Sequence, residues 1–130
     1  MHECFNNIVY FDCLSSSSDY LISLYKNLKL EKLITIYADN QTKGRGRMGK
    51  QWFSNSKGLT FSFSISLEKH HNVFDLTMLT AFSVIRFLHS IGVSASIKYP
   101  NDIVVNGKKI AGILTEVISV SPKKYEIIGV

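Results

Sequence analysis

Cysteine is scarce in this sequence: its 130 residues contain only two, Cys4 and Cys13. Their spacing is not that of a zinc site, and no third cysteine exists to complete one. A disulfide between them can be drawn, but reduced and buried thiols are the expectation for a cytosolic chain. We therefore expect neither a disulfide framework nor a metal held by the protein alone.

Long apolar runs are also missing. No stretch reaches the roughly 18 apolar residues that a membrane span requires. The first residues, MHECFNNIVYFDC, carry acids and amides where a secretory signal needs a basic region followed by an apolar one. With 45% hydrophobic residues, the chain has the composition of one globular domain. A cytoplasmic location without membrane contact is the expectation.

Acidic residues are absent from positions 43 to 57. The same segment holds five of the basic residues of a chain whose net charge is +5, namely Lys43, Arg45, Arg47, Lys50 and Lys57. A positive charge concentrated in this way favours a local anion site over an extended face for nucleic acid.

Hydrophobic spacing predicts two helices, 15–28 and 74–91, the second stopped by Gly92. Strands are predicted at 7–12, 32–39, 58–67, 94–100 and 124–130, and a hairpin about the Asn106–Gly107 turn. In 58–67 apolar residues alternate with serine and threonine, which predicts a strand whose apolar face is buried. The chain is therefore expected to be one α+β domain, residues 1–130, with a mixed, mainly antiparallel sheet flanked by helices.

The stretch TKGRGRMGKQW fits two phosphate-binding patterns, G-x-x-x-x-G-K and G-x-G-x-x-G. A P-loop needs serine or threonine after its lysine, but Gln51 stands there. Both patterns also need a helix directly afterwards, and residues 51–58 show no helical period. Protein kinases also use the G-x-G-x-x-G pattern, but the HRD and DFG motifs that must accompany it are absent from this sequence. What remains is a glycine loop (residues 40–57) between two strands, suited to an anion or, alternatively, merely a mobile basic surface.

A second polar segment surrounds Pro100, which must end a strand. Lys98 precedes the break, so that its ammonium can point into a pocket at the edge of the sheet. Asn101 and Asp102 follow it, and both are also ordinary turn formers. Two cationic segments framing one sheet suggest a site for a carboxylate linked to a nucleotide.

Three ordered motifs carry a resemblance to a known family. The segments GRGRMGKQW, KYPNDI and KKIAGILTE resemble the GRGRxGRxW, KWPND and K-x-x-GIL-x-E motifs in the catalytic domain of biotin protein ligases, also called biotin–[acetyl-CoA-carboxylase] ligases. Lys50 replaces the usual arginine and Tyr99 the usual tryptophan. The resemblance covers nearly the whole chain and implies a biotin/lipoate ligase-like fold, related to class II synthetases.

The resemblance implies a reaction in two steps. Biotin's carboxylate attacks the α-phosphate of ATP, giving biotinyl-5′-AMP and pyrophosphate, with Mg²⁺ on the phosphates. A lysine of a carrier domain, such as the biotin carboxyl carrier protein of acetyl-CoA carboxylase, then takes the biotinyl group and releases AMP. The implied partners are biotin, ATP and that carrier, and the family resemblance also allows a homodimer.

The resemblance also assigns residues to biotin and the adenylate. Arg47 and Lys98 are the implied catalytic residues, Arg47 retaining the intermediate and Lys98 contacting the carboxylate and the α-phosphate. Ser18 stands where the family has asparagine in a serine–threonine–asparagine helix start. We expect the glycine loop to be mobile without ligand. The full predicted set is Ser16, Ser17, Gln41, Gly44, Arg45, Arg47, Lys98, Lys109 and Gly112.

Two departures from the family shape the remaining expectations. The sequence stops at Val130, before the family's GIGxN segment, so we expect a catalytic domain incomplete at its C-terminus. About ten residues precede the first strand, too few for a DNA-binding helix-turn-helix, so we expect no operator binding. The alternatives are a lipoate-type ligase, a non-catalytic biotin- or carrier-binding module, and a nucleic-acid binder, although the chain lacks an RNA-binding motif.

Overall fold

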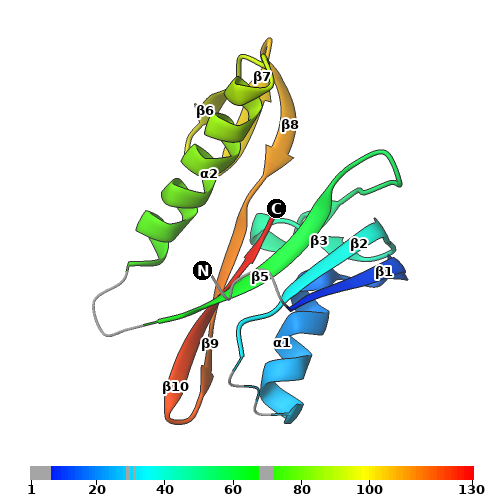
Figure 1. The fold of residues 1–130 in the computed structure, drawn as a ribbon, viewed down its shortest axis with the longest axis vertical. Coiled ribbons are helices and arrows are strands. Elements are labelled where there is room, and N and C mark those ends of the chain that lie inside the picture. Colours follow the sequence, from blue (N-terminus) through cyan, green and yellow to red (C-terminus); the bar gives the residue numbers. More distant parts are fainter. Residues whose placement is uncertain (1–6, 29, 31, 68–71) are drawn as a thin grey trace.

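The computed structural model describes residues 7–28, 30, 32–67 and 72–130. Within these residues, two helices, a 3₁₀ turn and ten strands follow one another. Figure 1 shows how they are arranged. Their bounds are β1 Ile8–Leu14, α1 Ser17–Leu28, β2 Thr35–Gln41, β3 Gly44–Arg45, the 3₁₀ turn Arg47–Gly49, β4 Gln51–Trp52, β5 Thr60–Ser66, α2 Val73–Ser90, β6 Ser96–Lys98, β7 Asp102–Val105, β8 Lys108–Gly112, β9 Leu114–Val120 and β10 Lys123–Gly129.

The main sheet has the strand order β1-β2-β5-β10-β9. Strands β1 and β2 run parallel because α1 carries the chain back between them, and every other neighbouring pair in this sheet is antiparallel. Two smaller sheets accompany it: the hairpin β3-β4 inside the glycine loop, and β6-β7-β8. The predicted α+β class, with a mixed and mainly antiparallel sheet, is confirmed.

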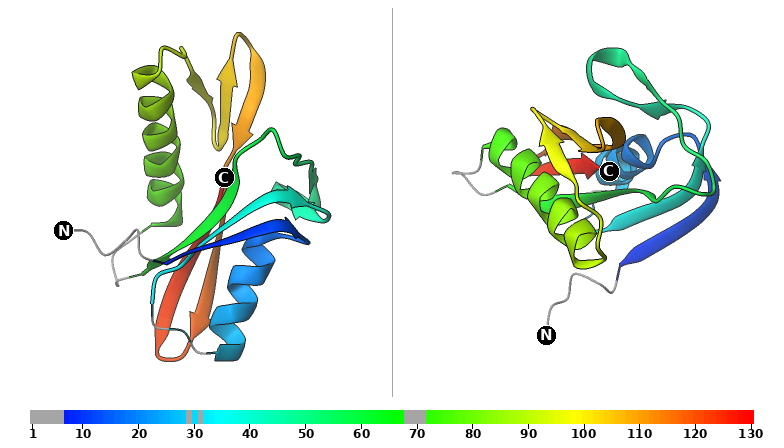
Figure 2. Two further views of the ribbon diagram at one scale, coloured as in Figure 1. Left: turned by 45° about the vertical axis from the view of Figure 1, so that its right-hand side comes forward. Right: turned by 90° about the horizontal axis from the view of Figure 1, so that it is seen from above.

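The two helices cover opposite faces of the main sheet (Figure 2). On one face, Leu21 and Tyr25 of α1 pack against Tyr125 and Ile127 of β10. On the other, α2 packs through Ala81 and Ile85 into a cluster that includes Ile128. Neighbouring residues of β10 therefore serve two separate apolar clusters, as the alternation of a strand requires.

Strand β5 is covered on both faces: Phe63 and Ile65 of the predicted apolar face pack against the α2 cluster, but the serine face is buried more deeply. Thr60, Ser62 and Ser64 are buried, whereas the phenylalanines between them are half-buried and Leu59 is 67% exposed. The serines can be buried because each hydroxyl has a partner: Ser62 contacts the serines of α1, and Ser64 bonds Tyr25. Small side chains here also let α1 approach the sheet closely.

Local chemistry accounts for the turns and helix ends. Asn106 and Gly107 have φ of 50° and 75°, the positive values that a tight hairpin turn demands, which confirms the predicted hairpin. Asn72 caps α2 by accepting a hydrogen bond from the Phe74 N–H, and Gly92 follows the helix with φ of 82°.

Two further observations bear on the opening expectations. Cys13 is free and exposed, so the expectation of a buried thiol is wrong there, while Cys4 lies outside the described residues. Helix α2, with 18 residues and a mean hydropathy of 1.2, is long and apolar enough to cross a membrane. Helices that pack on a sheet often have the same length and hydropathy, and α2 packs on the main sheet through Ala81 and Ile85.

One buried carboxylate stands out within the main sheet. Glu126 of β10 pairs with Ile65 and Val117 on the flanking strands and is fully buried. Neither of its carboxylate oxygens has a hydrogen-bond partner among the described residues. Burial raises the pKa of Glu126 from 4.5 to about 7, because the charged form loses its hydration.

We predict that Glu126 makes stability depend on pH. Between pH 4.5 and 7 the folded chain holds a proton that the unfolded chain releases, so stability falls as pH rises through this window and levels off above it. Glu126→Gln should remove up to about 3 kcal/mol of that fall. Urea unfolding of both proteins at pH 5 and pH 8 checks this; parallel pH dependences would contradict it.

Candidate active site

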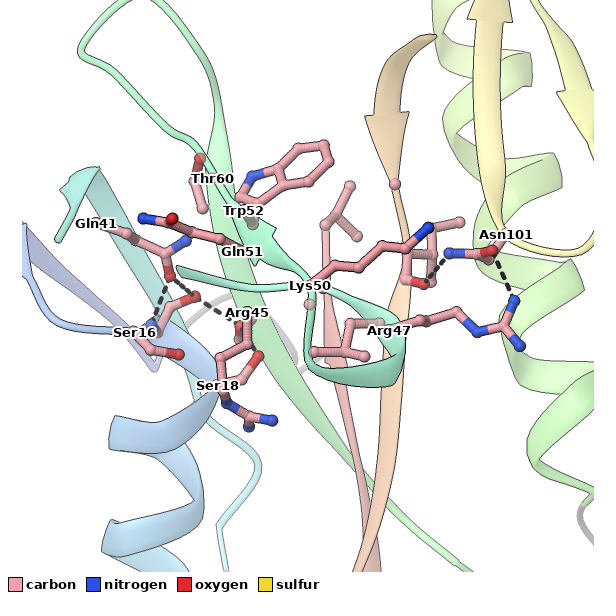
Figure 3. Close-up of a pocket in the computed structure, with 18 of the residues that line it drawn as sticks. Ser16, Ser18, Gln41, Arg45, Arg47, Lys50, Gln51, Trp52, Thr60 and Asn101 are labelled. Carbon is pink, nitrogen blue, oxygen red and sulfur yellow. Dashed lines mark hydrogen bonds between the residues drawn. The ribbon is translucent and has the colours of Figure 1, made fainter. Parts of the chain in front are cut away.

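A cavity of about 440 Å³ opens where α1, β2, the glycine loop and the ends of β5, β8 and β10 meet. This is a typical size for a small-molecule site. Figure 3 shows serines of α1 and Gln41 on one side, the loop residues across the middle, and Asn101 on the other side. Segments up to a hundred residues apart in the sequence thus contribute to one site.

One end of the cavity is a hydroxyl floor, made by the side chains of Ser17, Ser18, Ser62 and Gln41. Gln41 Oε1 accepts from the Ser17 backbone N–H at 2.7 Å and from the Ser17 hydroxyl at 2.9 Å. Ser62 Oγ lies 2.7 Å from Ser17 Oγ and 2.9 Å from Ser18 Oγ. The floor therefore joins the start of α1, the end of β2 and the middle of β5.

The protons of this floor can run in only one direction. Gln41 Oε1 accepts from a backbone N–H and cannot donate, so the single proton of Ser17 is used on Gln41. Ser62 must then donate to Ser17, and Ser18 must donate to Ser62. All three hydroxyl protons are therefore used in the series of hydrogen bonds that runs from Ser18 through Ser62 and Ser17 to Gln41. Toward a ligand, these hydroxyl oxygens can only accept hydrogen bonds, and both lone pairs of Ser18 are left to do so.

Hydrogen-bond donors border the same floor. The Ser16 hydroxyl accepts from the Asp19 N–H as the N-cap of α1, which leaves its proton uncommitted among the bonds described. The hydrogen bonds to the Gln41 oxygen also fix the position of its amide NH₂ group, which lies beside Gly44 and is a second donor. Acceptors and donors thus stand side by side on largely buried residues.

The two arginines of the glycine loop point in different directions (Figure 3). Arg45 bonds Asp19 in the first turn of α1 and makes a two-pronged contact with Glu116 of β9. The hydrogen bonds that Arg45 donates to Glu116, and then to Asp19, raise its pKa further above its usual range. Arg45 is therefore held by carboxylates of the protein itself.

Arg47 reaches the opposite wall. Its Nη1 donates to Asn101 Oδ1 at 2.9 Å. Asn101 Nδ2 in turn donates to the Ile113 carbonyl, and the backbone N–H of Ile113 donates to the Asn101 carbonyl. Because the NH₂ group of Asn101 is bonded to the Ile113 carbonyl, its side-chain oxygen is the atom that faces Arg47.

Three lysines bear on the site: Lys98 and Lys109, which the sequence predicted there, and Lys50, which it did not. Lys50 lines the cavity, its side chain extends across it toward Asn101 in Figure 3, and no bond is described for its amine. Lys109 also lines the cavity, 2.8 Å from Asp102 and over the ring of Trp52. Lys98 is exposed on β6 and is not among the lining residues, so its catalytic role stays a prediction.

Close packing requires glycine at position 44 and favours it at position 112. A Cβ on Gly44 would lie 2.6 Å from the Trp52 carbonyl oxygen and 3.0 Å from Gln41 Nε2. A Cβ on Gly112 would lie 3.2 Å from the end of Lys109 and 3.3 Å from Trp52. Each glycine thus makes room for a side chain of the cavity.

This geometry agrees with the comparison to known sequences. The profile of the biotin/lipoate A/B protein ligase family matches residues 10–130. The chain belongs to the biotin/lipoate A/B protein ligase family. Among its relatives is the bifunctional ligase/repressor BirA of Bacillus subtilis (strain 168), 39% identical over 116 residues, which are 85% of this chain and 34% of that protein. The chain therefore spans about a third of the length of this family member.

Solved structures give the same family resemblance in space. The biotin acetyl coenzyme A carboxylase synthetase of Helicobacter pylori, with bound biotinylated ATP, is 31% identical with a TM-score of 0.80, over 95% of this chain and 60% of that one. The biotin protein ligase of Aquifex aeolicus, in complex with biotin and ATP, is 31% identical with a TM-score of 0.79, over 97% and 52%. A lipoate protein ligase of Thermoplasma acidophilum, 14% identical with a TM-score of 0.66, shares the fold alone.

Most of the residues expected from the sequence meet at this cavity. Ser16, Ser17, Gln41, Arg45, Arg47, Lys109 and Gly112 line it, Gly44 packs directly behind Gln41 and Trp52, and Lys98 lies apart. Sequence reasoning missed the roles of Ser62, Asp19 and Glu116. The alternating serines of β5 were a signal for the first, but only the apolar face of that strand was expected to be buried.

We predict that the loop glycines differ sharply in tolerance. Gly44→Ala should cost about 2 kcal/mol of unfolding free energy, because the new methyl group meets backbone. Gly46→Ala is the matched control, since its nearest neighbour would be 3.4 Å away and its φ of −108° suits alanine. Thermal unfolding of both variants checks this; equal stabilities would contradict it.

Proposed function

We propose that this chain adenylates biotin with ATP and passes the biotinyl group to a lysine of a carrier protein. The observation that carries the proposal is the hydroxyl floor. Biotin's ureido ring offers two N–H donors and one carbonyl acceptor. The floor offers the complementary set: acceptor lone pairs on Ser18 and Ser17, and donors on Ser16 and the Gln41 amide.

The same floor disfavours a lipoyl substrate. A dithiolane ring has no N–H or carbonyl group, so it would cover buried polar groups without bonding them. Each buried polar group left unpaired costs about 1–3 kcal/mol. Sites built to hydrogen-bond a substrate reject analogues that lack the matching group. The floor therefore supports a cyclic urea over the lipoate alternative.

The cations suit the first step. Joining biotin's carboxylate to the α-phosphate brings two anions together, which is costly unless positive groups offset the repulsion. Arg47 and Lys50 reach into the cavity without a carboxylate partner among the contacts described. The carboxylate oxygen then bonds to the α-phosphorus and pyrophosphate departs, with ATP bringing Mg²⁺ on its phosphates.

The second step needs an intermediate that survives until the carrier arrives. The acyl-adenylate is hydrolysed by water, so the glycine loop lying over the cavity would shield it. The neutral amine of the carrier lysine attacks the acyl carbon, an amide bond forms, AMP leaves with the bonding electrons, and the amine loses a proton. A biotin carboxyl carrier protein domain and a cytoplasmic location fit this proposal, and both remain to be tested.

We predict that the chain supports biotin-dependent exchange of labelled pyrophosphate into ATP and gives little exchange with lipoate. Arg47→Gly should reduce exchange about 100-fold, as loss of a group that stabilises transition-state charge does. Lys57→Met is the matched control, because it removes a cation from the same loop outside the cavity lining. Exchange with lipoate at the biotin rate would contradict the substrate assignment.

The failure modes of this assay are distinct. If a folded chain binds biotin but exchanges no pyrophosphate, it is a binding module and not a ligase by itself. Lys98→Met beside Lys109→Met in the same assay tests the resemblance-based role of Lys98. A loss confined to Lys98→Met would support that role, and a loss confined to Lys109→Met would reject it.

A further inference from the structure

The contacts of Arg45 involve all three nitrogens of its guanidinium group. Its Nε lies 2.9 Å and its Nη2 2.6 Å from Asp19 Oδ1. On the other edge, Nη1 lies 3.1 Å from Glu116 Oε1 and Nη2 2.7 Å from Glu116 Oε2. All three nitrogens therefore contact carboxylates, and the pair with Glu116 has the parallel two-bond geometry that makes arginine pairs strong.

The charge of this cluster argues against a phosphate-binding role for Arg45. One guanidinium and two carboxylates sum to a net charge of −1, and phosphate would be repelled from it. The resemblance placed Arg45 against biotin and the adenylate, but the geometry gives its side chain a different duty. The lining cations without a carboxylate partner among the contacts described are its neighbours in the loop, Arg47 and Lys50.

The position of Arg45 shows which part of the glycine loop these contacts hold in place. Arg45 lies in β3 and pairs with Gln51 of β4, so it sits at the base of the small hairpin. Beyond it the loop is closed by two backbone bonds, from the Gly46 N–H to the Lys50 carbonyl and from the Lys50 N–H to the Arg47 carbonyl. Met48 at the tip is 92% exposed. The base is tied to two distant elements by ion pairs, whereas the tip is held across the cavity by the single hydrogen bond described between Arg47 and Asn101.

We propose that Asp19 and Glu116 are positioning residues that act through Arg45: they fasten the glycine loop across the cavity and so set how fast the loop opens and releases the intermediate. The three side chains bridge α1, β3 and β9, separated by 26 and 71 residues in sequence. Because they are 30–49% exposed, the clamp is of moderate strength and can reopen.

The first experiment needs no ligand: hydrogen exchange of the Gly46 and Lys50 amides in the full chain. Asp19→Asn and Glu116→Gln should each speed exchange about fourfold, because each variant weakens one of the two ion pairs of Arg45. Arg45→Met should speed exchange about tenfold, because it removes both ion pairs. Asp75→Asn is the matched control, because Asp75 occupies the first turn of α2 and the bond described for it is with Asn72, outside the glycine loop. Adding Asp19→Asn to Arg45→Met should change nothing further.

The second experiment rests on the proposed function: the rate at which the protein loses bound, radiolabelled biotinyl-adenylate. Asp19→Asn and Glu116→Gln should raise this rate about fourfold while leaving the biotin KM within about twofold, since neither side chain bonds the floor. Arg45→Lys should be intermediate, because lysine keeps the charge and loses the fork.

The two experiments separate the two proposals. If the wild-type chain forms no adenylate, the proposed ligase activity fails, and amide exchange still tests the clamp. If Asp19→Asn and Glu116→Gln leave loop exchange at the wild-type rate while the chain stays folded, the clamp is wrong. A biotin KM that rises in parallel with adenylate loss would also overturn it, since the residues would then act on binding in general.

Discussion

The hydrogen bonds among Ser17, Ser18, Ser62 and Gln41 connect the helix start, two strands and the glycine loop through one buried chain of protons. Much of the surrounding packing follows from it. A Cβ on Gly129 would lie 2.8 Å from Ser18 Oγ and 3.3 Å from Ser62 Oγ, so β10 must carry glycine where it passes the floor. The oxygen of Gln41 is fixed by a backbone donor, and this fixes every hydroxyl after it.

The cationic side chains near the cavity differ in whether their partner is a charged carboxylate or a neutral group. Arg45 is fastened by two carboxylates, Lys109 by Asp102 and the face of Trp52, and Arg47 by the neutral amide of Asn101. A neutral partner holds a guanidinium in place without cancelling its charge. Arg47 is thus oriented and still available to an anion, which a carboxylate partner would not permit.

The sequence predicted the elements of the fold well, because they depend on local periodicity and turn chemistry, as the Asn106–Gly107 hairpin shows. For β5 the sequence predicted burial of the apolar face, which packs against the α2 cluster, but not the deeper burial of the serine face. Alternation reveals that a strand has two faces, but serines can occupy the inner one when a second layer of hydroxyls meets them. No local pattern around β5 shows that α1 supplies that layer.

The site was predictable as a set of residues and less so as a network. Ordered motifs brought most of the lining residues together, yet motifs do not say which cation faces which partner. The contacts of Arg45 with Asp19 and Glu116 join positions 26 and 71 residues away, and only the assembled sheet brings them within reach. Lys98 shows the converse, a motif residue that lies outside the cavity lining.

The central claim is that the floor accepts hydrogen bonds from a ring bearing N–H groups. Calorimetric titration of the chain with biotin, and with a biotin analogue methylated on its ring nitrogens, tests it most directly. The account predicts measurable biotin binding and a loss of about 100-fold or more for the analogue, since its methyl groups leave the serine acceptors unpaired. Equal affinities for the two compounds would contradict it.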